Sequence, residues 1–172
     1  MTLLRELHAD IDARVQAIRE SRPDWLCGKG CDGCCRRLGE IPTLSAAEGD
    51  LLREGLAALP PERLEQITRD MRALAHEKSR PLTCPLLDHA ANACPVYAQR
   101  PVACRTYGFY VQRELGVYCL DIKSRVDDGS LADVVWGNHD AIDRRLADMG
   151  EKRLLTEWFT ANFDNHPVTS QD

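Results

Sequence analysis

At residues 27–35 the chain reads Cys27-Gly-Lys-Gly-Cys31-Asp-Gly-Cys34-Cys35, with four cysteines among nine residues. Cys31 and Cys34 have the two-residue separation that is typical of zinc and iron–sulfur loops, because a tight turn brings both sulfurs to one side. The glycines between the cysteines permit the positive φ angles that such turns need. We therefore expect residues 27–39 to form a metal-binding loop that is too short and too flexible for regular structure.

Cys34 and Cys35 are adjacent, and two neighbouring side chains rarely reach one ion without strain. Either the pair serves two different metals, or one member ligates while the other packs or reacts. Thiolates clustered this closely are unfavourable without a metal, so at least one of the two is expected to be a ligand.

Four further cysteines follow at Cys84, Cys94, Cys104 and Cys119. The first three are evenly spaced, with nine residues between each pair, and prolines follow Cys84 and Cys94. A Cys-Pro step also ends the bacterial ferredoxin-type run of ligands. All eight cysteines are therefore candidate metal ligands. Since cysteine is also among the most buried residue types, free buried thiols are the alternative, above all for Cys119, which has no cysteine near it in the sequence.

The composition of the chain indicates the redox compartment in which these thiols are found. The 172 residues suffice for one compact domain without disulfide bonds, and 44% hydrophobic with 28% charged residues is an ordinary globular balance. No apolar run is long enough to cross a bilayer, and the charged N-terminal segment lacks the apolar core of a signal peptide. We therefore expect a cytoplasmic protein without membrane insertion, in which reduced thiols favour metal binding over disulfides. A net charge of −5 gives no indication of a nucleic-acid partner.

The hydrophobic periodicity predicts a mainly α fold, a single compact helical domain in which two cysteine-rich loop regions converge on a metal site. The domain is expected to span residues 1–172. It divides into an N-terminal helix at 1–22, a cysteine-cluster metal-binding module at 27–119 and C-terminal helices at 140–163.

Within these regions the local signals are more specific. Ser45 and Glu48 have the spacing of a capping box at the start of a helix, and Pro61 suits the first turn of the next. Residues 107–118 are expected to contribute a short strand pair. The remaining expectations are one helical turn at 96–99, C-terminal helices at 140–149 and 151–163, and a frayed tail after Asn165.

Other catalytic chemistry has no visible signature in the sequence. Nucleophile-elbow, phosphate-loop and dinucleotide-binding motifs are absent, so no catalytic residue is assigned. His89 lies between two cysteines and could replace a sulfur, although a loop histidine facing solvent is the alternative. Arg100 and Arg105 flank Cys104. Each could stabilise a negatively charged thiolate site from outside the ligand set, or carry ordinary surface charge.

The cysteine pattern resembles the YkgJ-like CxxCxxCC family, whose members are described as zinc- or iron-chelating proteins. The resemblance rests on Cys31-x-x-Cys34-Cys35, Cys84-Pro-Leu-Leu-Asp88, Cys94-Pro-Val-Tyr97 and Arg100-Pro-Val-Ala-Cys104-Arg105-Thr-Tyr, and it runs from Cys27 to about Phe109. It implies a cysteine-ligated metal or iron–sulfur site. The family pattern has two residues between its first two cysteines, whereas Cys27 and Cys31 are separated by three.

Two functional hypotheses follow from these residues. In the first, an iron–sulfur cluster gives the protein a redox or accessory role, with a protein redox or assembly partner. In the second, Zn²⁺ is structural, and the domain mediates a protein interaction. Soft thiolates suit both metals. The near absence of histidines beside the eight cysteines favours iron.

Overall fold

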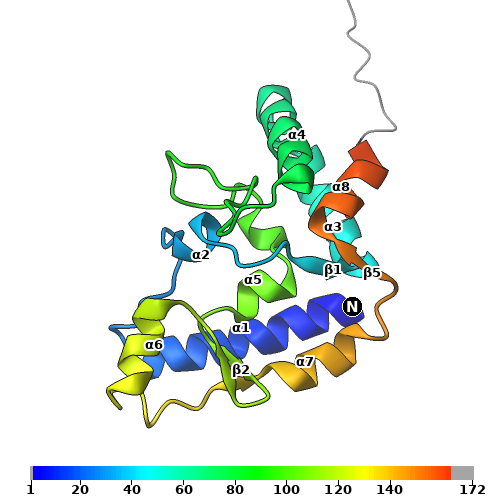
Figure 1. Ribbon diagram of the computed structural model, residues 1–172. Coiled ribbons are helices and arrows are strands. Elements are labelled where there is room, and N and C mark those ends of the chain that lie inside the picture. Colours follow the sequence, from blue (N-terminus) through cyan, green and yellow to red (C-terminus); the bar gives the residue numbers. More distant parts are fainter. Residues whose placement is uncertain (1, 164–172) are drawn as a thin grey trace, which may run out of the picture.

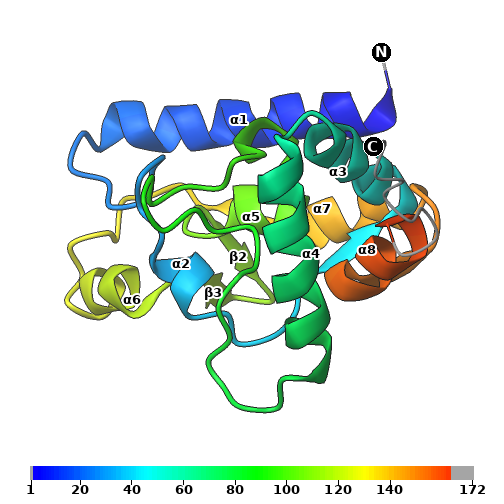
Figure 2. The same ribbon diagram turned by 90° about the horizontal axis from the view of Figure 1, so that it is seen from above.

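The structure is a computed structural model that describes residues 2–163, and about half of this part is helical (Figure 1). The long helix α1 (Leu3–Ser21) runs along one edge of the molecule, as Figure 2 shows from above. Helix α7 (His139–Leu146) lies beside it. On the other side of the molecule, α3 (Ala46–Ala57), α4 (Pro61–His76) and α8 (Leu155–Phe163) gather together. The predicted frayed tail after Asn165 lies outside the described residues.

The strands are short and pair in two small sheets within the described residues. Strand β1 (Thr43–Ser45) pairs antiparallel with β5 (Lys152–Leu154). Strands β2 (Tyr110–Gln112) and β3 (Leu115–Val117) form a hairpin, which confirms the predicted strand pair. The two-residue strand β4 (Gly137–Asn138) adds to β2 in parallel. The mainly α prediction is correct at this coarse level.

Most predicted helices are confirmed, including the capping box of α3, in which the Ser45 hydroxyl accepts from the Glu48 N–H. The expected turn at 96–99 is the 3-10 helix η1 (Tyr97–Gln99). The helix predicted at 151–163 begins only at Leu155, because residues 152–154 pair with β1 instead. The helix predicted at 140–149 ends at Leu146.

Three short helices were not predicted from the sequence. They are α2 (Gly33–Arg36), α5 (Val102–Thr106) and α6 (Leu120–Asp127). The prediction that residues 27–39 lack regular structure is therefore wrong for the single turn of α2, in which the Arg36 N–H donates to the Asp32 carbonyl. None of the helices between residues 2 and 163 has the length and apolar character needed to cross a membrane.

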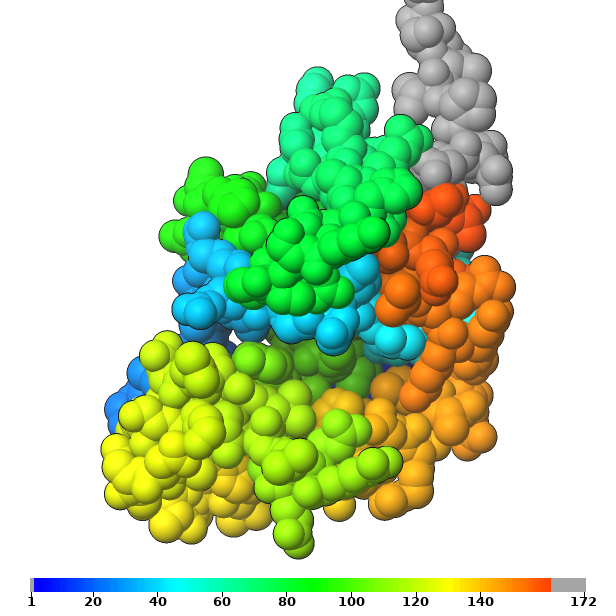
Figure 3. Space-filling view, in the orientation of Figure 1, coloured from blue at the N-terminus to red at the C-terminus, as the bar shows by residue number. Residues whose placement is uncertain are grey.

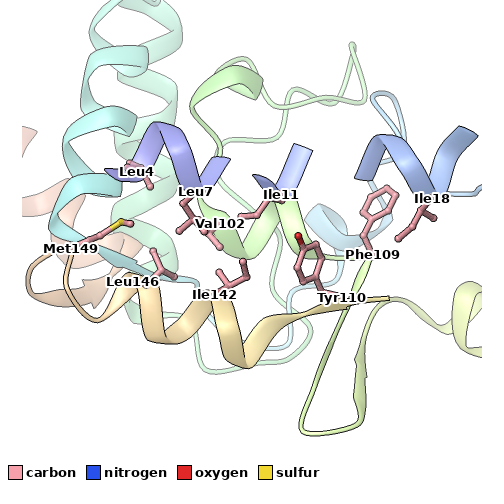
Figure 4. Packing of buried hydrophobic residues seen from close by; sticks show 10 residues of the cluster. All are labelled: Leu4, Leu7, Ile11, Ile18, Val102, Phe109, Tyr110, Ile142, Leu146 and Met149. Atoms are coloured by element: carbon pink, nitrogen blue, oxygen red, sulfur yellow. The ribbon is translucent and has the colours of Figure 1, made fainter. Parts of the chain in front are cut away.

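Two hydrophobic cores organise the elements. The first core joins α1, α5, β2 and α7 (Figure 4), and its buried residues are Leu4, Leu7, Ile11, Ile18, Val102, Phe109, Tyr110, Ile142, Leu146 and Met149. The second core joins α3, α4 and α8 with the loop after α4, and its buried residues are Leu44, Leu52, Leu56, Ile67, Met71, Leu86, Val96, Leu155 and Phe159. Cys27 packs against the first core, whereas Cys84 and Cys94 pack against the second.

The buried carboxylate of Glu48 connects the two cores. One of its oxygens accepts from the N–H and the hydroxyl of Ser45, both at 2.8 Å, which completes the cap of α3. Its other oxygen accepts from the Val102 N–H at 2.8 Å, at the N-terminus of α5. Because a carboxylate at a helix N-terminus is favourable, Glu48 fixes α5 against α3.

Candidate metal centre

Four thiols gather beside the first core and are called here the first thiol group: Cys27, Cys31, Cys34 and Cys119. Cys27 is the centre of this arrangement. Burial, followed by the charges of the other three thiols, raises the pKa of Cys27 to about 12, although Arg19 opposes this shift. The Tyr107 phenol lies among the same sulfurs, since burial and the charges of Cys119, Cys34 and Cys27 raise its pKa to about 12.

Backbone contacts bring Cys119 to Cys27 from a distant part of the sequence. Gly108 has a φ of 85°, and a Cβ atom at this position would overlap with the Cys27 sulfur. The Gly108 N–H donates to the Val117 carbonyl at 2.7 Å, which places the end of β3, and hence Cys119, beside it. Glycine is required here for both reasons, because an L side chain would be strained and would displace the thiol.

The other four thiols form the second thiol group: Cys35, Cys84, Cys94 and Cys104. The thiols of Cys84 and Cys94 act electrostatically on Cys35, and those of Cys35, Cys94 and Cys34 act on Cys104. In contrast to the first group, in which Cys31 is exposed, all four thiols of the second group are partly buried. The second group therefore lies deeper in the molecule.

Main-chain hydrogen bonds hold the segments of the second thiol group together. The Cys84 N–H donates to the Cys35 carbonyl at 2.7 Å, and Leu38 and Leu82 exchange two bonds of 2.8 Å in an antiparallel bridge. A second bridge between Asp88 and Ala93 folds the intervening loop back, so that the next residue, Cys94, returns to the site. Cys104 is carried by α5, the helix that Glu48 fixes.

Cys34 and Cys35 are the contact between the two groups. Their sulfurs lie 4.0 Å apart, yet Cys34 acts on Cys27 whereas Cys35 acts with Cys84. They occupy successive positions in α2, so their side chains point in directions about 100° apart around the helix. Cys34 also acts on Cys104, so it lies at the boundary between the two groups of thiols.

Two cavities adjoin these groups in the part of the chain that the structure describes. A cavity of about 390 Å³ is lined by all four thiols of the first group, and one of about 330 Å³ by all four of the second. Their walls share Cys31, Cys34, Cys104, Tyr97, Arg100 and Tyr107. Figure 3 shows the surface hollowed between the cyan and green segments above and the yellow segments below.

Three thiols of the second group have raised pKa values when no metal is bound. Contact with Cys34 lowers the pKa of Cys35, but the Cys84 thiol and burial outweigh it and raise that pKa to about 12. Burial, followed by neighbouring thiols, also raises the pKa of Cys104 to about 12, and burial raises that of Cys94. Because metal ligands are thiolates, a metal must displace these protons as it binds.

The two arginines that flank Cys104 have different positions. Arg100 lies in the walls of both cavities, and its charge partly opposes the rise in the pKa values of Cys94 and Cys104. Arg105 is buried, so the interpretation as surface charge is wrong, but it lines the cavity of the first thiol group, and a role beside the thiols stays a prediction. Its guanidinium contacts both oxygens of Asp12 at 3.1 Å and donates to main-chain carbonyls, so it ties α1 to the segment that precedes α5.

His89 is exposed and contacts an arginine instead of a sulfur. Arg36, in α2, lies 3.1 Å from the His89 ring and donates to the Asn92 side chain at 3.1 Å and to Asp32 at 2.6 Å. One guanidinium therefore connects the two cysteine-rich regions.

The donor set fits a thiophilic metal. Eight thiols face two cavities, and soft thiolates bind zinc and iron–sulfur centres well. Within residues 2–163, however, no three His, Cys, Asp or Glu side chains are grouped in a way that could hold one metal ion. The role of the eight cysteines as ligands stays a prediction.

A family model matches residues 26–123, which is more than half of the chain, and it is described as “CxxCxxCC: Putative zinc- or iron-chelating domain”. The matched segment contains all eight cysteines. A search of curated proteins and a search of solved structures gave no match.

Proposed function

We propose that this chain, which belongs to the CxxCxxCC family, uses its eight cysteines to hold two separate metal centres. The first thiol group would hold one centre and the second thiol group the other. The observation that carries this proposal is the pair of cavities, one lined by all four thiols of the first group and the other by all four of the second. Each group then has four thiols, the number that ligates both tetrahedral zinc and common iron–sulfur clusters.

We further propose that these centres are iron–sulfur clusters with a redox or accessory role. Four thiolates around a cluster lie farther apart than four around one zinc ion, because they are shared among two or more iron atoms. Cavities of 330–390 Å³ beside the thiol groups support the wider centre. A protein electron carrier or assembly factor would be the partner.

Structural zinc is the second candidate, and one observation favours it. Cys27 packs against the first core, whereas Cys84 and Cys94 pack against the second. A metal at each thiol group would therefore stabilise the junction between two cores, which is a structural role. In that case some rearrangement of side chains must bring four sulfurs within about 2.3 Å of each ion.

The test is metal and acid-labile sulfide analysis, with an absorption spectrum, on the chain purified without oxygen. Cys119→Ser removes a ligand of the first group, and Cys84→Ser removes one of the second. Each variant is expected to retain one of two centres, and the double variant neither. Iron with matching sulfide and a visible charge-transfer band would establish clusters.

Other outcomes have definite meanings. Stoichiometric zinc without sulfide would reject the redox role and leave the structural one. If either single substitution removed all of the metal from a chain that remains folded by circular dichroism, the division into two independent centres would be wrong.

A further inference from the structure

We propose that Arg100 is the counter-charge of the second centre and determines how firmly that centre is retained. This inference rests on the proposed function, because it requires that the second thiol group holds a metal. Four thiolates around a divalent ion carry a net negative charge, which is unfavourable in a partly buried site unless a cation lies nearby. In the described chain, Arg100 is the arginine that lines both cavities and acts on two thiols of the second group.

The Arg100 side chain is fixed before any metal binds. Its guanidinium lies over the Tyr97 ring, 3.3 Å from the centroid, and its Nε–H donates to the Tyr97 carbonyl at 2.9 Å. Stacking of this kind is stronger for arginine than for lysine. The guanidinium therefore loses little conformational freedom when the thiolates form.

The main chain at residue 100 is held as well. Arg105 donates from its Nε–H to the Arg100 carbonyl at 3.1 Å and pairs with Asp12 on α1. Arg105 thus acts on the scaffold, whereas the Arg100 side chain faces the cavities. The terminal N–H groups of Arg100 make no hydrogen bond within residues 2–163, so they are free to donate to sulfur.

The effect should be selective for the second centre. The charge of Arg100 acts on Cys94 and Cys104, while Arg19 is the arginine that acts on Cys27 in the first group. Groups outside the ligand set typically contribute 10- to 100-fold to metal affinity. Replacing Arg100 should therefore weaken one centre and leave the other nearly unchanged.

The experiment follows the release of metal from each centre to a chromogenic chelator. Arg100→Gln and Arg100→Lys are made in a Cys119→Ser chain, which retains the second centre, and in a Cys84→Ser chain, which retains the first. We expect Arg100→Gln to accelerate loss from the second centre by roughly 10- to 100-fold and from the first by less than threefold. Arg100→Lys keeps the charge and should restore part of the difference.

Arg113→Gln is the matched control, because it removes one positive charge at a side chain that is 87% exposed in the β2–β3 hairpin. Equal acceleration of both centres by Arg100→Gln, or no rescue by lysine, would overturn the inference and indicate a merely structural role. Release rates unchanged from the parent chains would overturn it too, while the two-centre proposal would stand. A parent chain that binds no metal would reject both.

Discussion

The two thiol groups are built in different ways, although each has four cysteines. The second group is framed by short main-chain hydrogen bonds, from Cys84 to Cys35 and between Leu38 and Leu82, and by α5, which Glu48 fixes. The first group combines the close approach between Cys27 and Gly108 with a hydrogen bond from Arg19 to the Cys27 carbonyl, and it takes Cys119 from a third segment. Its member Cys31 is exposed.

This difference indicates that the second site is largely formed by the fold itself, whereas the first should depend more on metal. A preformed site binds without ordering its surroundings, while a loop site is ordered by the metal. The second centre is therefore expected to be the more stable, and the first the more exchangeable.

Removal of metal should give the largest effect. Strong chelation is expected to raise cleavage by a low dose of protease within residues 27–35 by more than tenfold, because metal orders this segment. Cleavage within 84–104 should rise less, and the helical circular dichroism should be largely kept. Mass spectrometry of timed digests locates the cuts. If the two segments are cut at equal rates, the proposed difference between the groups is incorrect.

Substitution of single cysteines tests the same difference between the two thiol groups. Cys104→Ser should remove half of the metal and about 4 kcal/mol of unfolding free energy, which is the contribution of a ligand present at about 1,000 times its Kd. Cys31→Ser should cost less than half as much, since its exposed thiol belongs to the less ordered site. Metal analysis and urea unfolding measure both quantities. A more costly Cys31→Ser would reverse the order of the two sites.

Glu48 offers a test that does not alter a cysteine. Its carboxylate is 3% exposed and accepts three hydrogen bonds, so Glu48→Ala leaves buried donors without a partner. We expect a loss of about 3 kcal/mol in unfolding free energy and a release of α5. Metal should then leave the second centre faster than the first.

The exposed Glu54→Ala substitution on the same helix is the control for this loss. Chelator competition, measured as for Arg100, separates the centres. Equal weakening of both would show that Glu48 supports the fold alone.

The sequence predicts much of this fold because the deciding signals are local. The capping box at Ser45 and Glu48, Pro61 at the start of α4 and the apolar spacing of α1 all act within a few residues. The expected helix at 151–163 is too long because Lys152–Leu154 pairs with β1, more than 100 residues away in the sequence. Pairing of that kind leaves no local signal.

The same distinction applies to the candidate site. The adjacency of Cys34 and Cys35 is visible in the sequence and led to the hypothesis of two metals. Cys119 has no cysteine near it in the sequence, so no local signal places it in the site. Its approach to Cys27 depends on Gly108 and a long-range hydrogen bond. The contrast between Arg100 and Arg105 depends on where each side chain points, which a motif does not encode.

The smallest expected effect is a pH dependence confined to the first core. Burial, followed by the charge of Arg105, lowers the pKa of His8 from 6.5 to about 4, against a weaker opposing effect of Asp12. The folded chain thus keeps this imidazole neutral at pH values at which the unfolded chain already protonates it. Its contribution to stability is complete above pH 6.5 and is lost as the pH falls towards 4.

At pH 5 the loss should be about 1 kcal/mol, after allowance for partial burial. Urea unfolding of the reduced, metal-free chain at pH 7 and 5 measures it. Trp25 lies beside the first core and Trp158 beside the second, so single-tryptophan chains report the cores separately. His8→Leu should abolish the difference at Trp25. An equal acid-induced loss of unfolding free energy at both tryptophans would mean that the cores unfold as one unit. The two thiol groups would then differ in local order alone.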